Sequence, residues 1–456
     1  MHIATAVTAM TRAILFFSET GMKFYDRLSE INTLCRIEKM SEKAAQMTIM
    51  VGRRRVGKTT LLKNAYSNTP VLYFFVAKKN EVLLCEEFSQ EIDDKLTERA
   101  GLFRSFSELF KFIMRISERL RFTLIIDEFQ EFQHINKSIF SDMQNIWDSY
   151  KDKSQINLVL CGSIYSMMKQ IFENAKEPLF GRAGSKIVIR PFDTATIKKV
   201  LSDHYPDYCN EDLLAFYMLT GGVAKYMDQL MMCSAYTKET MLDSLFEVGS
   251  LFLDEGRAVL IDEFGKDYSN YFSVLSLIAS SRAERGMIER ILGMPVGGYL
   301  DRLEKEYGLI RRLRPFMAKE GSRFNKYVIE DNFLNFWFRF IYKYRSAIEI
   351  GNLQYVRDIV ARDYEVYSGI MLEKYFRTKL MEANKYSDIQ GYWDRKGENE
   401  IDIVAVNEMQ KEIVFYEVKR NKKKINLALL KQKSTSIILK YPAFKADYIA
   451  LSMDDM

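Results

Sequence analysis

The sequence predicts an α/β protein whose parallel sheet carries a phosphate-binding loop, and three observations support this. In residues 47–62 an apolar run ends at Gly52, and the spacing G-x-x-x-x-G-K-T then leads into a helix-forming segment. Further apolar runs at 71–77, 122–126 and 156–161 fit strands that are buried on both faces, which is typical of parallel sheets. Helical patterns separate these runs, as the crossovers between parallel strands require.

The loop after the first strand is the most specific signal in the chain. Its backbone N–H groups and the positive end of the next helix form a cradle for an anion, and Gly52 and Gly57 allow the close backbone path. Lys58 is expected to reach the β- and γ-phosphates, and Thr59 to bind Mg²⁺. The alternative, a chance match on a basic surface turn, does not account for the flanking strand and helix. The residues expected to hold the nucleotide are Gly52, Arg53, Arg54, Arg55, Val56, Gly57, Lys58, Thr59 and Thr60.

Polar residues follow two later strands, where the carboxyl edge of a parallel sheet brings them near the loop. Asp127 directly follows the run at 122–126 and is expected to hold the Mg²⁺ water shell, while Glu128 is expected to polarise the attacking water. A plain acidic turn is the alternative. Ser163 follows the next strand and either senses the γ-phosphate or caps a helix.

Two arginines are further candidates. Arg182 lies on a glycine-containing loop before the strand 186–189, and we expect it beside the sheet edge as an arginine finger, acting in its own chain or on a neighbouring subunit. An ordinary solvated arginine is the competing interpretation. Near the start, a helix running towards Met40 brings Tyr25 and Arg27 close to an adenine base, or else is a simple surface helix.

Composition limits the class of protein. The 456 residues suffice for about three domains, and 48% hydrophobic with 28% charged residues is an ordinary soluble composition. A net charge of +5 is too small to argue for nucleic-acid binding alone, so a basic binding surface has to be local. Five cysteines without a C-x-x-C pair, and three histidines, argue against a zinc site and suit a reducing cytosol, so we expect a cytoplasmic protein.

The chain shows no segment for a membrane. No apolar run approaches the ~18 residues of a spanning helix, so we expect no membrane partner. Residues 1–21 are expected to be a loosely attached leader, and Met22 is an alternative start.

The middle of the chain changes from mixed to helical patterns. Residues 193–260 fit a helical lid over the nucleotide, and 268–330 predict three helices and an arginine-rich hairpin, the pattern of a winged helix-turn-helix. Such a module reads DNA or packs against protein. The third helix, 297–306, carries three acids, which is a poor composition for phosphate contact. The aromatic stripe in 333–344 is expected to be core.

A second group of charged residues lies near the carboxyl terminus. Fifteen residues separate Asp402 from Glu417, which suits adjacent hairpin strands, and period two puts Glu417 and Lys419 on one face. Two carboxylates and a lysine at a strand end can bind a divalent metal, activate water and stabilise a pentavalent phosphate. The basic run 422–424 attracts anions. A surface hairpin with cross-strand ion pairs is the alternative.

These motifs resemble the AAA+-related (STAND-like) P-loop ATPases of archaea and some bacteria, over nearly all of residues 22–456. The segments that carry the resemblance are Phe24-x-Asp26-Arg27-x-x-Glu30, Gly52 to Thr59, Ile126-Asp127-Glu128-Phe129-Gln130, Cys161-Gly162-Ser163 and Leu179-Phe180-Gly181-Arg182. The resemblance implies ATP and Mg²⁺ as ligands. Relatives typically carry Gly-Gly-x-Pro in the lid, where this chain has Gly221-Gly222-Val223-Ala224.

The carboxy-terminal part is similar to the PD-(D/E)XK nuclease, or restriction-endonuclease-like, fold. The resemblance places Glu373 in the first helix, Asp402 on the second strand and Glu417-Val418-Lys419 on the third, and implies that these residues are catalytic.

The expected domains are a P-loop ATPase core at 22–190, a lid at 191–262, a winged helix at 263–332, a helical linker at 333–362 and a nuclease-like domain at 363–456. We expect an ATP-hydrolysing switch coupled to a domain that acts on DNA. The alternatives are an ATP-dependent DNA-binding regulator or scaffold without nuclease activity, and an oligomeric, motor-type ATPase.

Overall fold

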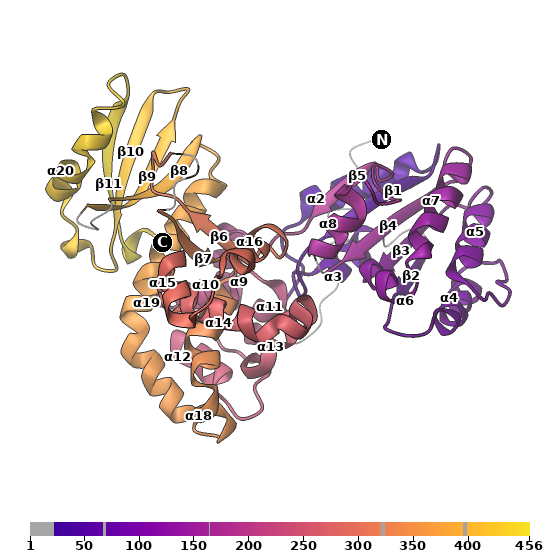
Figure 1. Ribbon diagram of the computed structural model, residues 1–456, viewed down its shortest axis with the longest axis horizontal. Coiled ribbons are helices and arrows are strands. Elements are labelled where there is room, and N and C mark those ends of the chain that lie inside the picture. Colours follow the sequence, from indigo (N-terminus) through magenta and orange to yellow (C-terminus); the bar gives the residue numbers. More distant parts are fainter. Residues whose placement is uncertain (1–21, 67–69, 164, 320, 322–323, 395–398) are drawn as a thin grey trace. The chain divides into compact units, whose positions relative to one another are not determined.

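The computed structural model describes residues 22–66, 70–163, 165–319, 321, 324–394 and 399–456 (Figure 1). The expected leader at 1–21 lies outside these residues. The described chain forms two compact units that divide between Arg190 and Pro191, where the sequence predicts the first domain to end. Residues 22–24 join the second unit. Each unit is described by itself.

The first unit is built on a parallel sheet with the strand order β2-β3-β4-β1-β5. Its strands are β1 (Gln46–Val51), β2 (Val71–Phe75), β3 (Phe122–Asp127), β4 (Ile156–Gly162) and β5 (Ser185–Val188). Every residue of β3 and β4 is buried, which explains why their sequences are apolar on both faces. All five carboxyl ends meet at one edge of the sheet, so this edge collects the residues that follow β1, β3 and β4.

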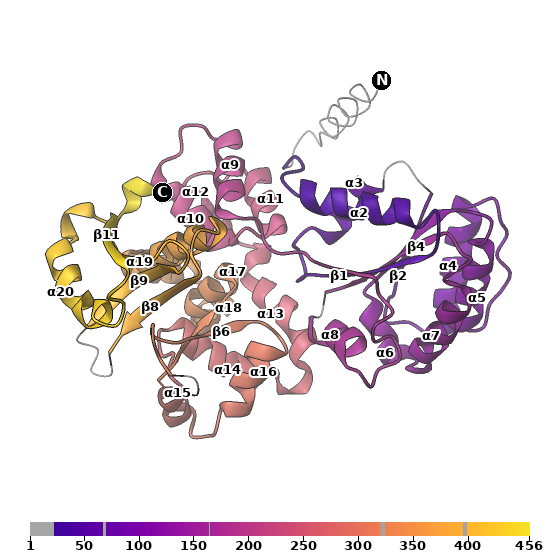
Figure 2. The ribbon, with the colours of Figure 1, turned by 90° about the horizontal axis from the view of Figure 1, so that it is seen from above.

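Helices cover both faces of this sheet (Figure 2). They are α2 (Leu28–Met40), α3 (Lys58–Ala65), α4 (Glu81–Lys95), α5 (Phe106–Ile116), the short α6 (Phe132–Ile135), α7 (Ser138–Tyr150) and α8 (Tyr165–Glu173). Met47, Ile49 and Val51, which alternate along β1, share one core cluster with buried residues of α4, α5, α7 and α8. Helices α2 and α3 pack together beside β1.

The second unit begins with helices only, as expected for 191–262. They are α9 (Thr194–His204), α10 (Asn210–Thr220), α11 (Ala224–Met232), α12 (Lys238–Leu245) and α13 (Leu251–Phe264). Every residue of α10 from Asp212 to Thr220 is buried, so this helix forms the centre of the bundle.

Three helices and a two-stranded antiparallel sheet come next, in the order that the sequence predicts. They are α14 (Tyr268–Ala279), α15 (Arg285–Leu292), α16 (Gly297–Lys305), β6 (Ile310–Leu313) and β7 (Lys326–Ile329). A bridge between Glu284 and Lys326 adds the chain before α15 to the edge of β7. The apolar stripe that follows is core as predicted, because Phe333, Phe336 and Phe340 are almost fully buried.

That stripe is not one regular helix. It consists of α17 (Asn332–Phe336), a π-helical segment (Trp337–Ile341) and a short 3-10 turn (Tyr342–Tyr344), followed by α18 (Arg345–Glu349). The next helix, α19 (Leu353–Glu382), is continuous through the boundary that the sequence predicts at 362/363. The expected helical linker and the first helix of the last domain are therefore partly one element.

The last part is a four-stranded mixed sheet in the order β11-β10-β9-β8, with one helix in the crossover between β10 and β11. Its elements are β8 (Asp388–Trp393), β9 (Glu400–Asn407), β10 (Glu412–Val418), α20 (Leu427–Ile438) and β11 (Lys445–Leu451). β9 is antiparallel to both neighbours, and β10 and β11 are parallel. β9 and β10 form the predicted hairpin, and their ladder ends with Tyr416 opposite Ile403, so the same register extended by one residue sets Glu417 opposite Asp402.

Among the described residues, no helix is both long enough and apolar enough to cross a membrane.

Candidate functional site

The loop after β1 has a backbone that depends on its glycines. Gly57 has φ +95° at the start of α3, a left-handed value that side chains disfavour. A Cβ on Gly52 would lie 2.8 Å from the carbonyl oxygen of Ile189, so no side chain fits there. Val56 is buried and anchors the loop, while Arg55 and Thr60 are exposed and Arg53 and Arg54 are half-buried. The loop thus leads directly into the amino terminus of α3, where backbone N–H groups remain available to an anion.

Lys58 is held inside this loop. Its Nζ donates hydrogen bonds to the carbonyl oxygens of Gly52, at 2.6 Å, and Arg53, at 3.2 Å. Burial lowers the pKa of Lys58, and the negative charges of Glu128 and Asp127 oppose that shift. Lys58 is therefore within electrostatic reach of both carboxylates, so the sheet edge brings these three predicted residues together.

Asp127 is buried at the end of β3 and has a partner that the sequence analysis missed. The hydroxyl of Tyr73 on β2 donates a hydrogen bond to Asp127 Oδ2 and also interacts with the Thr59 hydroxyl. Burial and the hydrogen bond to Asp127 raise the pKa of Tyr73, so the phenol stays protonated and remains a donor. Tyr73 links the two residues expected at Mg²⁺. The sequence did hold a sign of this role, because the hydroxyl of Tyr73 is the one polar side-chain group in the apolar run 71–77.

Glu128 is fixed by two donors. Its backbone is left-handed, with φ +53°, and its Oε2 accepts hydrogen bonds from Ser163 Oγ, at 2.6 Å, and from Gln130 Nε2. Ser163 is almost fully buried. It therefore has a role that neither sequence interpretation named, because it orients Glu128; its contact with a γ-phosphate stays a prediction.

Arg27 ties the start of α2 to the end of the first unit. Its guanidinium donates to the carbonyl of Arg190 at 2.6 Å and forms an ion pair with Glu30 at 3.2 Å. The side chain is buried, and so is Tyr25. These bonds give Arg27 a structural role, so its contact with an adenine base stays a prediction.

Arg182 lies at the amino ends of the strands, which corrects the expectation that it borders the γ-phosphate of its own chain. Gly184 N donates to Met47 O at the start of β1, whereas the phosphate loop follows the other end. The six residues of β1 separate the edge at Arg182 from the edge at the phosphate loop by about 16 Å. The reason is topological: a segment that enters a parallel strand lies at the edge opposite to a segment that leaves one.

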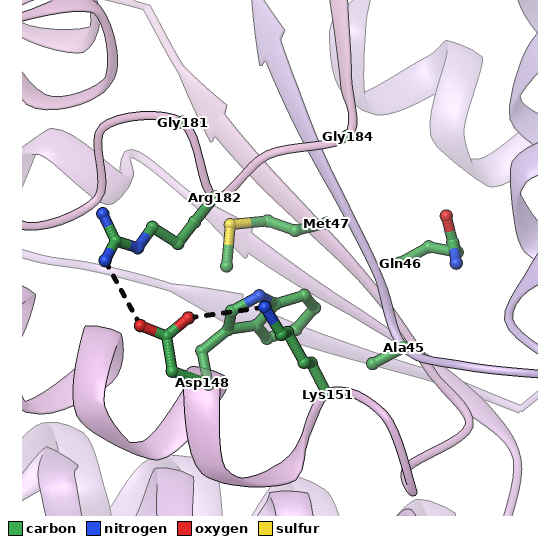
Figure 3. Close-up of a pocket in the computed structure, with 9 residues that line it drawn as sticks. Ala45, Gln46, Met47, Asp148, Lys151, Gly181, Arg182 and Gly184 are labelled. Carbon is green, nitrogen blue, oxygen red and sulfur yellow. Dashed lines mark hydrogen bonds and ion pairs between the residues drawn. The ribbon is translucent and has the colours of Figure 1, made fainter.

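A cavity of about 430 Å³ lies beside Arg182, and Figure 3 shows the residues around it. Arg182 turns towards Asp148 and forms an ion pair at 3.2 Å, while Lys151 approaches the other carboxylate oxygen at 3.8 Å. The Arg182 side chain is 29% exposed, so it remains accessible to another molecule.

A second charged cluster lies on the sheet of the second unit. Lys419 Nζ forms ion pairs with Asp402, at 3.2 Å, and Glu417, at 3.1 Å. The backbone N–H of Val418 also donates to Asp402 Oδ2, at 2.7 Å. The structure thus brings together the three residues that the sequence selected on this hairpin.

The cluster extends to α19 through Arg377, which the sequence analysis did not name. Its Nη2 donates to Glu373 Oε1 and, at 2.8 Å, to the carbonyl oxygen of Asp402. Arg377 thereby holds Glu373 beside β9. The spacing of four residues between Glu373 and Arg377 on a helix was a signal that could have found this pair.

The electrostatics of this cluster disfavour the fully ionised state. Burial raises the pKa of Glu373 to about 7, with Arg377 opposing and Asp402 reinforcing the shift. Burial also raises the pKa of Asp402, and Glu417 adds to the rise. For Lys419, burial lowers the pKa, but the charges of Asp402 and Glu417 raise it by more. The net shift is upward, so the ammonium form is favoured. No group of three or more histidine, cysteine or acidic residues in the described ranges is arranged to hold a metal.

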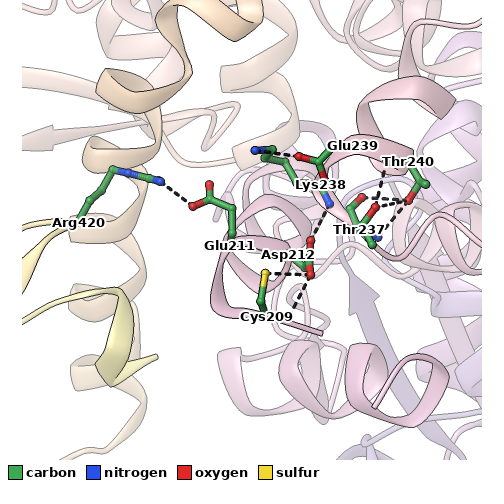
Figure 4. A network of polar contacts seen from close by, with 8 residues as sticks. All are labelled: Cys209, Glu211, Asp212, Thr237, Lys238, Glu239, Thr240 and Arg420. Atoms are coloured by element: carbon green, nitrogen blue, oxygen red, sulfur yellow. Dashed lines mark hydrogen bonds and ion pairs between the residues drawn. The ribbon is translucent and has the colours of Figure 1, made fainter. Parts of the chain in front are cut away.

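The residue after Lys419 connects this sheet to the helices at the start of the unit (Figure 4). Arg420 forms an ion pair with Glu211 of α10 at 2.6 Å and donates to Ser368 of α19 at 2.7 Å. On the same helix, Asp212 accepts from the backbone N–H of Lys238, at 2.8 Å. Polar contacts therefore run from Arg420 to α10 and α19, and Asp212 joins α10 to the start of α12.

Two family models match the chain. Residues 24–230 match a family described as an ATPase domain predominantly from Archaea. Residues 337–436 match a family described as archaeal and bacterial proteins of unknown function.

Whole-chain comparisons show similar proteins. An uncharacterized protein of Methanocaldococcus jannaschii is 27% identical over 406 residues, which is 87% of each chain. The structure of a Walker-type ATPase of Pyrococcus abyssi has 18% identity and a TM-score of 0.54, covering 69% of this chain and 96% of its own. The ORC2 protein of Aeropyrum pernix has 15% identity and a TM-score of 0.47, covering 67% and 90%. Residues 24–230 are therefore similar in sequence to an archaeal ATPase domain, and the fold is similar to that of a Walker-type ATPase.

Proposed function

We propose that this chain binds and hydrolyses ATP at the carboxyl edge of the first sheet. The observation that carries the proposal is the convergence of Lys58, Asp127 and Glu128, because two separate segments place a cation and two carboxylates around one helix amino terminus. The match to an archaeal ATPase domain supports it.

Each residue has a role that follows from its position. The loop N–H groups and Lys58 hold the β- and γ-phosphates, and Lys58 exchanges its bonds to Gly52 and Arg53 for phosphate oxygens. Glu128 orients the attacking water through the carboxylate oxygen that Ser163 and Gln130 leave free, and accepts its proton.

The residues also fit Mg²⁺. The Thr59 hydroxyl and the Asp127 carboxylate are hard oxygen donors, and Tyr73 links them, which agrees with the ligands that Mg²⁺ prefers. When bound there, the ion neutralises charge on the phosphates. Tyr73 keeps Asp127 directed towards Thr59.

The test separates binding from turnover. Glu128→Gln keeps the size and most hydrogen bonds of Glu128 but removes its base, so ATP should bind as in wild type and turnover should fall at least ~100-fold. A matched control is Glu131→Gln, which makes the same substitution three residues later, at the end of the short 3-10 helix that follows Glu128. Equal turnover in Glu128→Gln and wild type would refute the role of Glu128.

Arg182 completes the site of a neighbouring copy. Its position at the far edge of the sheet, its exposure and the open cavity beside it suit contact with a second subunit rather than with its own nucleotide. Asp148 and Lys151 hold the arginine until that contact forms. This assigns ATP hydrolysis to an oligomer.

The carboxy-terminal sheet supports a second function, cleavage of DNA with a divalent metal. The specific observation is that Asp402 and Glu417 face each other across β9 and β10 with Lys419 between them. The element order α19-β8-β9-β10-α20-β11 supports assignment to the restriction-endonuclease-like fold. The same fold without cleavage would be a DNA-binding module, which is the alternative.

The cluster offers two carboxylate oxygens to a divalent cation, and the remaining ligands would come from water and the phosphate. Asp402 Oδ2 and Glu417 Oε1 contact Lys419, while Asp402 Oδ1 and Glu417 Oε2 have no partner among the described residues. Two such oxygens are suitable ligands for Mg²⁺ or Mn²⁺, which would polarise the scissile phosphate. Lys419 then stabilises the negative charge that develops on that phosphate, and Glu373 accepts a proton because its pKa of about 7 suits a base at neutral pH.

The remaining elements connect the two functions. The helices α14 to α16 with β6 and β7 form a winged helix, and α9 to α13 form the lid that responds to ATP. The pair of Arg420 with Glu211 transmits this response, because Arg420 directly follows Lys419 and Glu211 belongs to α10.

The nuclease proposal is tested with supercoiled and linear DNA in Mg²⁺ or Mn²⁺, with and without ATP. Wild type should cleave, and Asp402→Asn and Lys419→Ala should not, although both keep wild-type ATPase activity. Lys431→Ala, on the exposed face of α20, is a control that should cleave normally. If wild type cleaves no DNA under any condition but binds it, the DNA-binding alternative replaces the nuclease.

A further inference from the structure

A cavity of about 350 Å³ lies between β6 and the first strand of the carboxy-terminal sheet, β8, whose segments lie side by side (Figure 1). Its size is in the range of ligand sites. Its charged residues and its indole donor come from β6, the residue after β6, α19 and β8, and are Arg311, Arg312, Arg314, Arg377, Asp388 and Trp393.

Three N–H donors of the lining residues have no acceptor in the part of the chain that the structure describes. They are Nε of Arg312, Nε of Arg377 and the indole Nε1 of Trp393, and all three are buried. Arg377 and Trp393 are themselves more than nine-tenths buried. A buried donor without an acceptor is destabilising, so three beside one cavity indicate a ligand that supplies acceptors.

The charge around the cavity is positive. Arg311 pairs with Glu330 at 2.7 Å and Arg312 with Glu304 at 2.8 Å, which neutralises part of it. Arg314 is exposed and forms no ion pair with any described residue. The acid in the lining, Asp388, accepts two hydrogen bonds from Gln390 Nε2. The ligand is therefore an anion rich in acceptor oxygens.

The walls of the cavity are fixed to each other. Phe316 N donates to Gly391 O at 2.8 Å, which joins the segment after β6 to β8. The Phe316 ring belongs to the core of the last sheet, together with Ile401 and Phe415. The arginines of β6 are thus held at a constant position beside β8, as a binding site requires.

The cavity adjoins the Asp402 cluster. Arg377 lines the cavity and also donates to the carbonyl oxygen of Asp402, at 2.8 Å. A Cβ on Gly391 would lie 3.4 Å from that same oxygen. A group bound in the cavity is therefore a near neighbour of a phosphate positioned at Lys419.

We propose that this cavity binds a phosphate group of a nucleic-acid backbone, one that flanks the phosphate held at Asp402 and Lys419. The inference rests on the proposed action on DNA. Arg314 supplies the charge, and the indole N–H of Trp393 with the guanidinium edges of Arg312 and Arg377 supplies the hydrogen bonds. β6 and β8 then bind the same nucleic-acid strand.

The test measures binding of a fluorescein-labelled DNA duplex to the full chain by anisotropy, over a series of salt concentrations. Arg314→Gln should bind roughly tenfold more weakly and with a salt slope reduced by about one. Trp393→Phe removes the N–H but keeps the ring that packs near Phe324 and Lys326; it should bind roughly tenfold more weakly with an unchanged slope.

Arg345→Gln is the matched control, because Arg345 is an exposed arginine of the same unit outside the cavity. It should keep both affinity and slope. Thermal unfolding checks that each variant is folded. Wild-type binding by both cavity variants, or equal weakening by Arg345→Gln, would overturn the proposal.

A second arm separates the sources of the phosphate. In a Lys58→Ala background, inorganic phosphate is titrated while thermal unfolding is followed. One outcome is that the chain with an unaltered cavity binds no duplex, that phosphate still raises its unfolding temperature, and that Trp393→Phe abolishes this rise. In that case the proposed binding of a nucleic-acid backbone and the proposed action on DNA both fail, and a site for free phosphate replaces them. If the duplex is cleaved with dependence on Asp402 while the cavity variants behave as wild type, only the cavity proposal fails.

Discussion

Substitution of Ser163 by alanine tests how Glu128 is positioned. Ser163 Oγ donates to Glu128 Oε2 at 2.6 Å, and the serine is 1% exposed, so no water replaces the lost donor easily. Alanine at this position leaves Gln130 as the one remaining side-chain donor to that carboxylate among the described residues. Glu128 then samples orientations that do not face the attacking water.

The size of the effect follows from the bond. A hydrogen bond to a charged group contributes ~1.5–3 kcal/mol, which corresponds to a range of roughly 10- to 150-fold in rate. Because Gln130 still restrains the carboxylate, we expect the lower end, about a tenfold fall in kcat. The KM for ATP should stay unchanged if Ser163 acts only through Glu128, whereas a raised KM would support the predicted contact of Ser163 with the γ-phosphate.

Steady-state ATPase kinetics measure both constants. Ser154→Ala is a suitable control, because Ser154 is also buried in this unit but donates to Met114 O at 3.0 Å, far from the loop. It should keep the wild-type kcat. A wild-type or increased kcat in Ser163→Ala would show that the hydrogen bond does not prepare Glu128 for catalysis.

Three further predictions concern charged pairs. In a double-mutant cycle of Arg420→Ala and Glu211→Ala, the free energy of unfolding should show a coupling of ~1–2 kcal/mol, because the 2.6 Å pair is only about a quarter exposed; additive effects would exclude the link. The Glu373 carboxyl has its pKa raised from 4.5 to about 7, so the native state binds more protons than the unfolded state between these values. The wild-type free energy of unfolding should therefore fall as pH rises through this window, and Glu373→Gln should flatten the dependence; parallel profiles in urea titrations would refute the shift. Arg182→Ala should bind ATP but lose turnover, and mixing it with Glu128→Gln should restore some ATPase activity, whereas no recovery at any ratio would argue against a shared site.

Much of the first sheet follows directly from sequence pattern. The apolar runs became β2, β3 and β4 because strands buried on both faces need apolar residues on both faces. The register that opposes Glu417 to Asp402 was also predictable, since period two and a short turn leave few alternatives. Residue spacing therefore anticipated which side chains of one hairpin share a face.

Contacts between distant segments were not predictable in the same way. Tyr73 and Asp127 meet only because β2 pairs with β3, and Ser163 meets Glu128 only because β4 lies beside β3. A single strand carries no signal for its neighbour. Near the start, α2 begins after a left-handed Arg27 without a side-chain cap, and no residue pattern signals that backbone conformation.

The position of Arg182 differs, because the order of elements along the sequence is enough to predict at which edge of the sheet it lies. Residues that follow a parallel strand lie at its carboxyl edge, and residues that precede one lie at the opposite edge. Arg182 precedes β5, so its own γ-phosphate was out of reach from the order of elements alone.

The central claim is that the loop before α3 binds ATP through Lys58. Isothermal calorimetry with Mg²⁺–ATP tests it most directly, using wild type, Lys58→Ala and the control Lys63→Ala, whose side chain lies exposed on the last turn of α3. The account predicts that Lys58→Ala loses at least ~10-fold in affinity, because a buried ammonium no longer meets the phosphates, while Lys63→Ala binds as wild type. Equal affinity of wild type and Lys58→Ala would contradict it.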